Sequence, residues 1–228
     1  MAIEKDILMA TSFEPASTPR LRCELHNAIT HFAHSTFECD MTDPHSIELV
    51  HFGSKRWANY FKVVLLGLQS VLPPEVRQNA HGTIKVLVDG TVPPESSLSS
   101  SAAMTTCSSI VILTALKALH VVPRKVIADV ACHSERLVGV HSGGMDQAVS
   151  VFGQRDKALF VSFAPTLHVS PIELPLGHQY VFLVTNTMIK SDKKATAPER
   201  YNLRVVETRL AAAVLKRCLL YTSDAADE

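Results

Sequence analysis

The 228-residue chain carries 22 basic and 22 acidic side chains, so its formal net charge is zero, and 46% of its residues are hydrophobic. This length and composition allow a substantial buried core and argue against a disordered or collagen-like chain. The balanced charge argues against nucleic acid as the main partner, because phosphate backbones require a basic protein face. A small anionic ligand needs only a local positive field and is not excluded.

Cysteine spacing and hydropathy indicate the cellular compartment in which the protein is expected. The five cysteines are scattered, without a C-x-x-C pair, which favours reduced thiols in a cytoplasmic protein. No secretory signal leads the chain. The most apolar run, Ile110–Val122, is too short to span a bilayer, so we expect a soluble protein with no membrane partner.

Four elements are predicted in the first half of the chain. "IEKDILMATSF" is typical of a strand that leads into a turn, and Ser46–Phe52 is predicted as a second short strand. "KRWANYFKVVLLGLQSVLPPE" has one apolar helical face and is expected to end at Pro73 and Pro74. Gly82–Gly90 alternates apolar and polar residues between two glycines, which predicts a strand.

The second half mixes helices and strands. Leu98–Leu119 is apolar on most helical faces, which predicts a central buried helix. Pro123 is expected to open a helix to about Val138, followed by a glycine-bearing loop, "HSGGMDQ". "KALFVSF" and "QYVFLVTNT" are predicted strands, and "ERYNLRVVETRLAAAVLKR" is a predicted amphipathic helix. Because helices and strands do not alternate regularly, we expect an α+β fold.

A serine-rich stretch, "PPESSLSSSAAM" (Pro93–Met104), precedes the predicted central helix. One serine could cap the helix, because the first backbone N–H groups have no helical partner. Five serines exceed what one cap requires, and the helix dipole adds partial positive charge there, which suits a phosphate. Capping and anion binding therefore both remain open. The stretch is not a Walker loop, since no G-K-[ST] follows.

Several motifs together resemble one enzyme family. "RWANYFK", "VPPESSLSSSAA", "SERLVGVHSGGMDQAVSVFG", "ALFVSFAP" and "SDKKATAPERYNLRVVETRLAA" occur in order between Arg56 and Ala213. They resemble the GHMP small-molecule kinases, in the fungal galactokinase version, and are also similar to N-acetylgalactosamine kinase. The resemblance implies an α+β fold of the ribosomal protein S5 domain 2-like type.

The resemblance implies residues for catalysis and sugar binding. Asp146 in "GGMDQ" matches the catalytic aspartate, whose carboxylate accepts or orients the proton of a sugar hydroxyl. Gly143 would let the backbone approach the sugar closely. Tyr201 matches a tyrosine that lines the galactose site, although a tyrosine on the buried face of a helix would serve packing alone.

It also implies a site for ATP and Mg²⁺. Ser99 and Ser100 would hold nucleotide phosphates, and Ser101 with Glu135 would hold the cation, a hard ion that prefers oxygen ligands. Trp57 and Lys193 are two further candidates for nucleotide contact. Trp57 could instead belong to the core, and Lys193 could instead be a solvated surface residue.

The chain departs from the family pattern at two positions of the serine stretch. Glu95 and Ser97 stand where the family has glycine, which permits positive φ and close backbone approach. A carboxylate that pointed inward would repel phosphate, so we expect Glu95 to point to solvent.

Departures at both ends predict a partial kinase. The family's upstream galactose signature and its C-terminal glycine-rich motif are absent, and "CLLYTSDAADE" has no family counterpart. We therefore expect residues 1–165 to form a partial GHMP kinase N-terminal domain. Residues 166–217 are expected to begin the remaining fold, and 218–228 are interpreted as a non-native tail.

The function implied by the resemblance is phosphorylation of galactose at its C1 hydroxyl by ATP, with little or no activity expected from this chain alone. Two alternatives are kept. One is N-acetylgalactosamine kinase. The other is a non-catalytic galactose sensor, which binds sugar, ATP and a regulatory protein partner.

Overall fold

The computed structural model describes residues 3–163, 166–173, 183, 185, 187 and 197–224. The chain divides into two compact units. The first comprises Met1–Val138 and Ser142–Ser191, and the second comprises Gly139–His141 and Asp192–Glu228.

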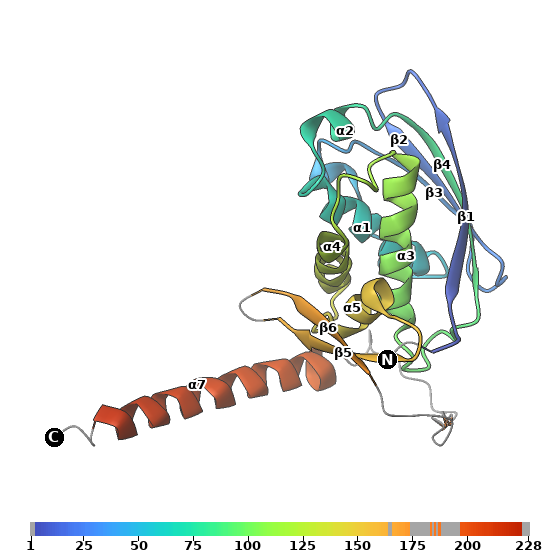
Figure 1. The fold of residues 1–228 in the computed structure, drawn as a ribbon. Helices are drawn as coiled ribbons and strands as arrows, with labels where there is room; N and C mark the ends of the chain where they lie inside the picture. The colour runs from blue at the N-terminus through green and yellow to red at the C-terminus, as the bar shows by residue number, and fades with distance from the viewer. Residues whose placement is uncertain are drawn as a thin grey trace. The chain divides into compact units, whose positions relative to one another are not determined.

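A four-stranded sheet forms one layer of the first unit, in the order β1-β4-β2-β3 (Figure 1). The strands are β1 (Ile7–Pro15), β2 (Leu21–Asn27), β3 (Ser35–Cys39) and β4 (Gly82–Gly90). β4 pairs antiparallel with β1 and parallel with β2, and β2 pairs antiparallel with β3.

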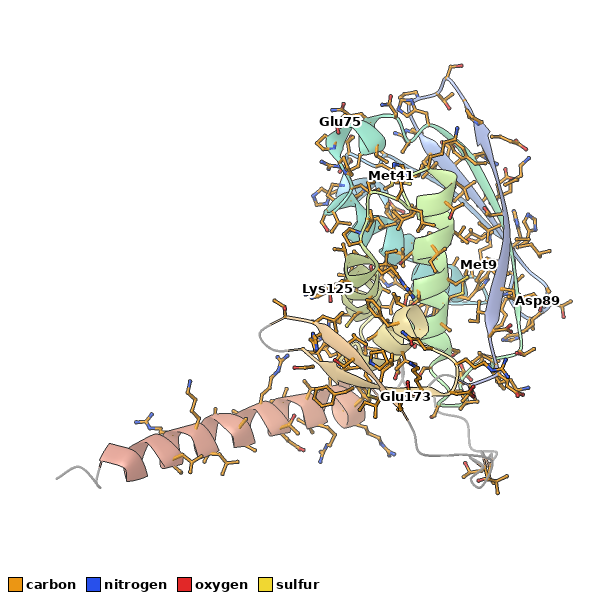
Figure 2. All side chains as sticks on the ribbon, in the orientation of Figure 1. Met9, Met41, Glu75, Asp89, Lys125 and Glu173 are labelled. Carbon is orange, nitrogen blue, oxygen red and sulfur yellow. The ribbon has the colours of Figure 1, made fainter. Side chains whose placement is uncertain are left out.

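One face of this sheet is buried and the other meets solvent. Along β4, Ile84, Val86 and Val88 are buried, and the side chains between them are more accessible. This alternation is the pattern of a sheet that packs one face on a core. Figure 2 shows the division, because Asp89 projects from the side of the sheet away from the helices.

Helices cover the buried face. They are α1 (Asn59–Gln69), α2 (Pro74–Gln78), α3 (Ser100–Ala115), α4 (Arg124–Arg136) and α5 (Met145–Phe152), with 3₁₀ turns at Pro44–Ser46 and Arg56–Ala58. α3 contacts β1, α1, α4 and α5, and it is buried around most of its circumference. The predicted central buried helix is therefore confirmed.

The remaining elements follow α5. β5 (Lys157–Ser162) pairs antiparallel with β6 (His168–Glu173), and β5 contacts α5. The second unit contains a π-helical turn, Ala197–Tyr201, and α7 (Asn202–Asp224). Within the described ranges, no helix is both long and apolar enough to cross a bilayer.

Most sequence-predicted elements are confirmed. The strand at Gly82–Gly90 has the expected bounds, and α1, α3, α4, β1, β5 and the α7 helix lie where the patterns place them. β2, β3 and β6 were not predicted. α1 ends at Gln69, before the prolines, and Pro74 lies in α2 instead of stopping α1. The predicted strand "QYVFLVTNT" falls largely outside the described residues.

The predicted strand at Ser46–Phe52 is wrong. Side chains of α1 take over the hydrogen bonds that a neighbouring strand would supply. Asn59 Oδ1 accepts from the Val50 N–H at 2.9 Å, and Asn59 Nδ2 donates to the Val50 carbonyl at 2.7 Å. Lys62 Nζ donates to the Glu48 carbonyl at 2.7 Å. The segment is thus fixed as extended coil.

Candidate active site

The serine stretch lies at the mouth of a helix. β4 ends at Gly90 and α3 begins at Ser100, so the intervening loop leads directly into the free N–H groups of the first helical turn. Ser100 and Ser101 occupy that turn and are half-buried. The predicted position of the serines at a helix N-terminus is confirmed.

The loop backbone contains three non-glycine residues with positive φ. Glu95, Ser97 and Ser99 have φ of 58°, 60° and 57°, so every second residue is left-handed. Alternation of right- and left-handed residues turns successive N–H groups toward one concavity, an arrangement that binds anions elsewhere. Glu95 is exposed, as expected from the sequence, so its carboxylate does not fill the loop.

Glycine at position 95 or 97 is expected to stabilise the loop. A left-handed non-glycine residue is strained, so Glu95→Gly and Ser97→Gly should each raise the free energy of unfolding by about 0.5–1 kcal/mol. Glu95→Gly should also tighten ATP binding more than Ser97→Gly, because it removes a negative charge. Thermal unfolding and calorimetric titration with ATP would measure both effects.

Ser96→Gly is the matched control for these substitutions. Ser96 lies between the two positions without positive φ, and its Oγ donates to the Pro93 carbonyl at 2.7 Å. Ser96→Gly should therefore lower the free energy of unfolding. Equal effects at all three positions would show that loop strain is not the cause.

Asp146 lies in the first turn of α5 and is joined to the serine loop. Ser99 Oγ donates to Asp146 Oδ2 at 2.7 Å, across 47 positions of sequence. The N-terminal ends of α3 and α5 lie close together, as Figure 1 shows, because the two helices pack on each other. Ser99 was predicted as a phosphate ligand; its hydroxyl is engaged by Asp146, which leaves its backbone N–H for that role.

Glu135 is a buried carboxylate on α4. It lies in the last turn of α4 and is 3% exposed. Its Oε2 accepts from Ser142 Oγ at 2.8 Å and from Gln147 Nε2 at 2.6 Å. It forms no ion pair with any residue the structure describes. A carboxylate that is buried without a cation among its described neighbours is a candidate ligand for a bound cation.

The donor set fits Mg²⁺. Glu135 supplies a carboxylate and Ser101 a hydroxyl, both hard oxygen donors. Among the described residues, no group of three or more His, Cys, Asp or Glu could form a protein cage for a metal. Mg²⁺ usually keeps water and substrate phosphates among its ligands, so it needs few protein oxygens.

The turn between Glu135 and Asp146 is held from the α4 side. Arg136 donates from Nη2 to the Ser142 carbonyl at 3.3 Å. Gly144 has φ of 90°, and a Cβ there would lie 2.9 Å from Cys132 Sγ. Burial raises the pKa of the Cys132 thiol, so it packs as a neutral group against this glycine. Asp146 and Gln147, predicted in a loop, instead belong to α5.

The other predicted site residues are Trp57, Tyr201, Lys193 and Gly143. Trp57 is 8% exposed, and its Nε1 donates to the Ala33 carbonyl at 2.9 Å, which makes it a core residue. Tyr201 lies in the second unit, at the end of the π-helical turn. Lys193 lies outside the described residues. Their ligand roles, like that of Gly143, stay predictions.

Sequence reasoning missed Ser142 and Gln147. Ser142 directly precedes the Gly143–Gly144 pair, Gln147 follows it by three positions, and both hydrogen-bond to Glu135. The only signal was their place inside "SGGMDQ", where a polar residue stands on each side of the turn.

A family model described as "GHMP kinases N terminal domain" matches residues 59–154, which include α3, α4, α5 and the serine loop. Over this range the chain is similar to GHMP kinases. It is 32% identical over 225 residues to a galactokinase of Schizosaccharomyces pombe, covering 95% of this chain and 42% of that protein. It is 35% identical over 220 residues to a galactokinase of Candida albicans, covering 96% and 41%.

The fold is also that of a solved sugar kinase. A structure of Lactococcus lactis galactokinase complexed with galactose aligns with a TM-score of 0.67 and 21% identity, covering 94% of this chain and 50% of that one. The expected GHMP kinase fold is therefore confirmed. The chain spans about two fifths of the length of the two curated relatives it matches.

Proposed function

We propose that this chain carries catalytic and nucleotide-binding residues of an ATP-dependent galactose kinase, which forms galactose 1-phosphate. The observation that carries the proposal is the 2.7 Å hydrogen bond from Ser99 to Asp146. It joins a loop shaped for phosphate to a carboxylate suited to a sugar hydroxyl. The galactokinase relatives support galactose as the acceptor.

In the proposed reaction, the C1 hydroxyl oxygen of galactose bonds to the γ-phosphorus of ATP as the bond from that phosphorus to the bridging oxygen breaks. ADP leaves, and the hydroxyl proton passes to Asp146. Because Ser99 holds Oδ2, the carboxylate keeps a fixed orientation with Oδ1 left for the proton. The left-handed loop and the first turn of α3 would bind the phosphates through backbone N–H groups.

Ser101 and Glu135 would hold Mg²⁺, which neutralises phosphate charge when it is bound. The buried Glu135 carboxylate supports this assignment, since no described residue neutralises it. A cytoplasmic location belongs to the same proposal and is supported by the five free cysteines.

A chimera tests the proposal directly. Residues 3–163 would replace the segment with which they align in the S. pombe galactokinase, and sugar 1-phosphate formation would be measured with galactose and N-acetylgalactosamine. We expect ATP-dependent product from galactose. Product from N-acetylgalactosamine alone would reassign the substrate, and binding of ATP and galactose without product would favour the non-catalytic sensor.

A further inference from the structure

The Glu135 carboxylate is held in an asymmetric way. Both of its hydrogen bonds, from Ser142 Oγ and Gln147 Nε2, arrive at the same oxygen, Oε2. Two neutral donors on one oxygen fix the orientation of the group without neutralising its charge. Oε1 is used by neither donor, so within the described residues it remains available to ligate a cation.

Gln147 is an unusual choice for a core position. It is completely buried, and its Oε1 has no hydrogen-bond partner among the described residues. A buried acceptor without a donor is unfavourable, and an apolar side chain of similar length, such as methionine, would avoid it. Packing alone therefore does not account for the amide, whereas its 2.6 Å bond to Glu135 does.

The position of Gln147 links the two carboxylates of the site. It follows Asp146 in the first turns of α5, and it reaches across to the last turn of α4. Hydrogen bonds from buried partners orient metal ligands in proteins, and their loss lowers metal affinity by about 10- to 100-fold.

We propose that Gln147 is a positioning residue: its amide holds Glu135 by Oε2 so that Oε1 stays available to the divalent cation bound with ATP. The inference rests on the proposed function, because it assumes that Glu135 meets Mg²⁺ when nucleotide binds. It assigns no direct contact with substrate to Gln147.

Calorimetric titration of this chain with ATP, at limiting and saturating Mg²⁺ and in EDTA, tests the inference. Gln147→Met should weaken ATP binding about 10-fold at limiting Mg²⁺, recover at saturating Mg²⁺, and leave binding in EDTA unchanged. Substitution of manganese for magnesium would report the cation itself by electron paramagnetic resonance, with the same expected loss of affinity.

Gln69→Met is a matched control. Gln69 is also a buried glutamine with an unpartnered Oε1, but its Nε2 donates to the Asp40 carbonyl, remote in sequence from Glu135. Its replacement should leave the Mg²⁺ dependence unchanged. Circular dichroism would establish that both variants fold.

The outcomes separate the two proposals. If the unsubstituted chain binds ATP without Mg²⁺ dependence, or not at all, the magnesium part of the proposed function and the role of Gln147 are both overturned. Suppose instead that ATP binding by the unsubstituted chain depends on Mg²⁺. The role of Gln147 alone is then overturned if Gln147→Met shows the same Mg²⁺ dependence, or if this variant loses as much ATP affinity in EDTA as in Mg²⁺. Should Gln147→Met not fold, Gln147→Leu removes the same amide, and an unchanged Mg²⁺ dependence in that variant would overturn the inference.

Discussion

Asp146→Asn is expected to lower kcat for galactose phosphorylation by about 100- to 10,000-fold in the chimera, the range for loss of a general base. Asparagine has the same shape, and its side-chain oxygen can still accept from Ser99 Oγ, so the first turn of α5 should persist. What it lacks is the ability to take the sugar hydroxyl proton. ATP affinity should therefore change little, and the effect should appear in kcat.

Ser150→Ala controls for damage to α5. Ser150 is exposed on the same helix, and its Oγ donates to the Asp146 backbone carbonyl at 2.9 Å. Ser150→Ala should leave kcat unchanged, although it removes a hydrogen bond to the backbone of Asp146. If Asp146→Asn kept the kcat of the parent chimera, Asp146 would not be the proton acceptor, whatever its position beside the serine loop.

The fold was predictable where one segment carries its own pattern. Gly82–Gly90 has the expected bounds because its alternating residues match one buried and one open face. β2 and β3 escaped prediction because they are short, and the apolar face of β2 includes a cysteine between polar neighbours. Ser46–Phe52 failed for a tertiary reason, since Asn59 supplies its backbone partners.

The candidate site was likewise predictable only where a local motif carries the information. Motif resemblance predicted roles for Asp146, Glu135 and the serines, which stay predictions. The expected glycine at Glu95 and Ser97 anticipated the left-handed backbone found there. The bond from Ser99 to Asp146 depends on how α3 packs against α5, which no local pattern encodes. The role of Gln147 depends likewise on the contact between α4 and α5.

The two glycines before α5 are expected to respond differently to alanine. Gly144 has φ of 90°, and a Cβ there would lie 2.9 Å from Cys132 Sγ and 3.2 Å from Phe163 Cε1. Left-handed strain and overpacking together should lower the free energy of unfolding by about 3 kcal/mol in Gly144→Ala. Because Asp146 follows two residues later, a shift of about 1 Å in α5 could also cost about 100-fold in rate.

Gly143→Ala separates a sugar contact from a folding effect. Gly143 lacks positive φ, and a Cβ there would meet no atom within 4 Å, so its stability should change by less than about 0.5 kcal/mol. If the backbone at Gly143 approaches galactose closely, the added methyl must raise KM for galactose while urea unfolding is unaffected. An unchanged KM would remove Gly143 from the sugar site, and an unchanged unfolding midpoint in Gly144→Ala would show that the turn relaxes. The pair thus distinguishes a glycine required by the ligand from its neighbour required by the fold.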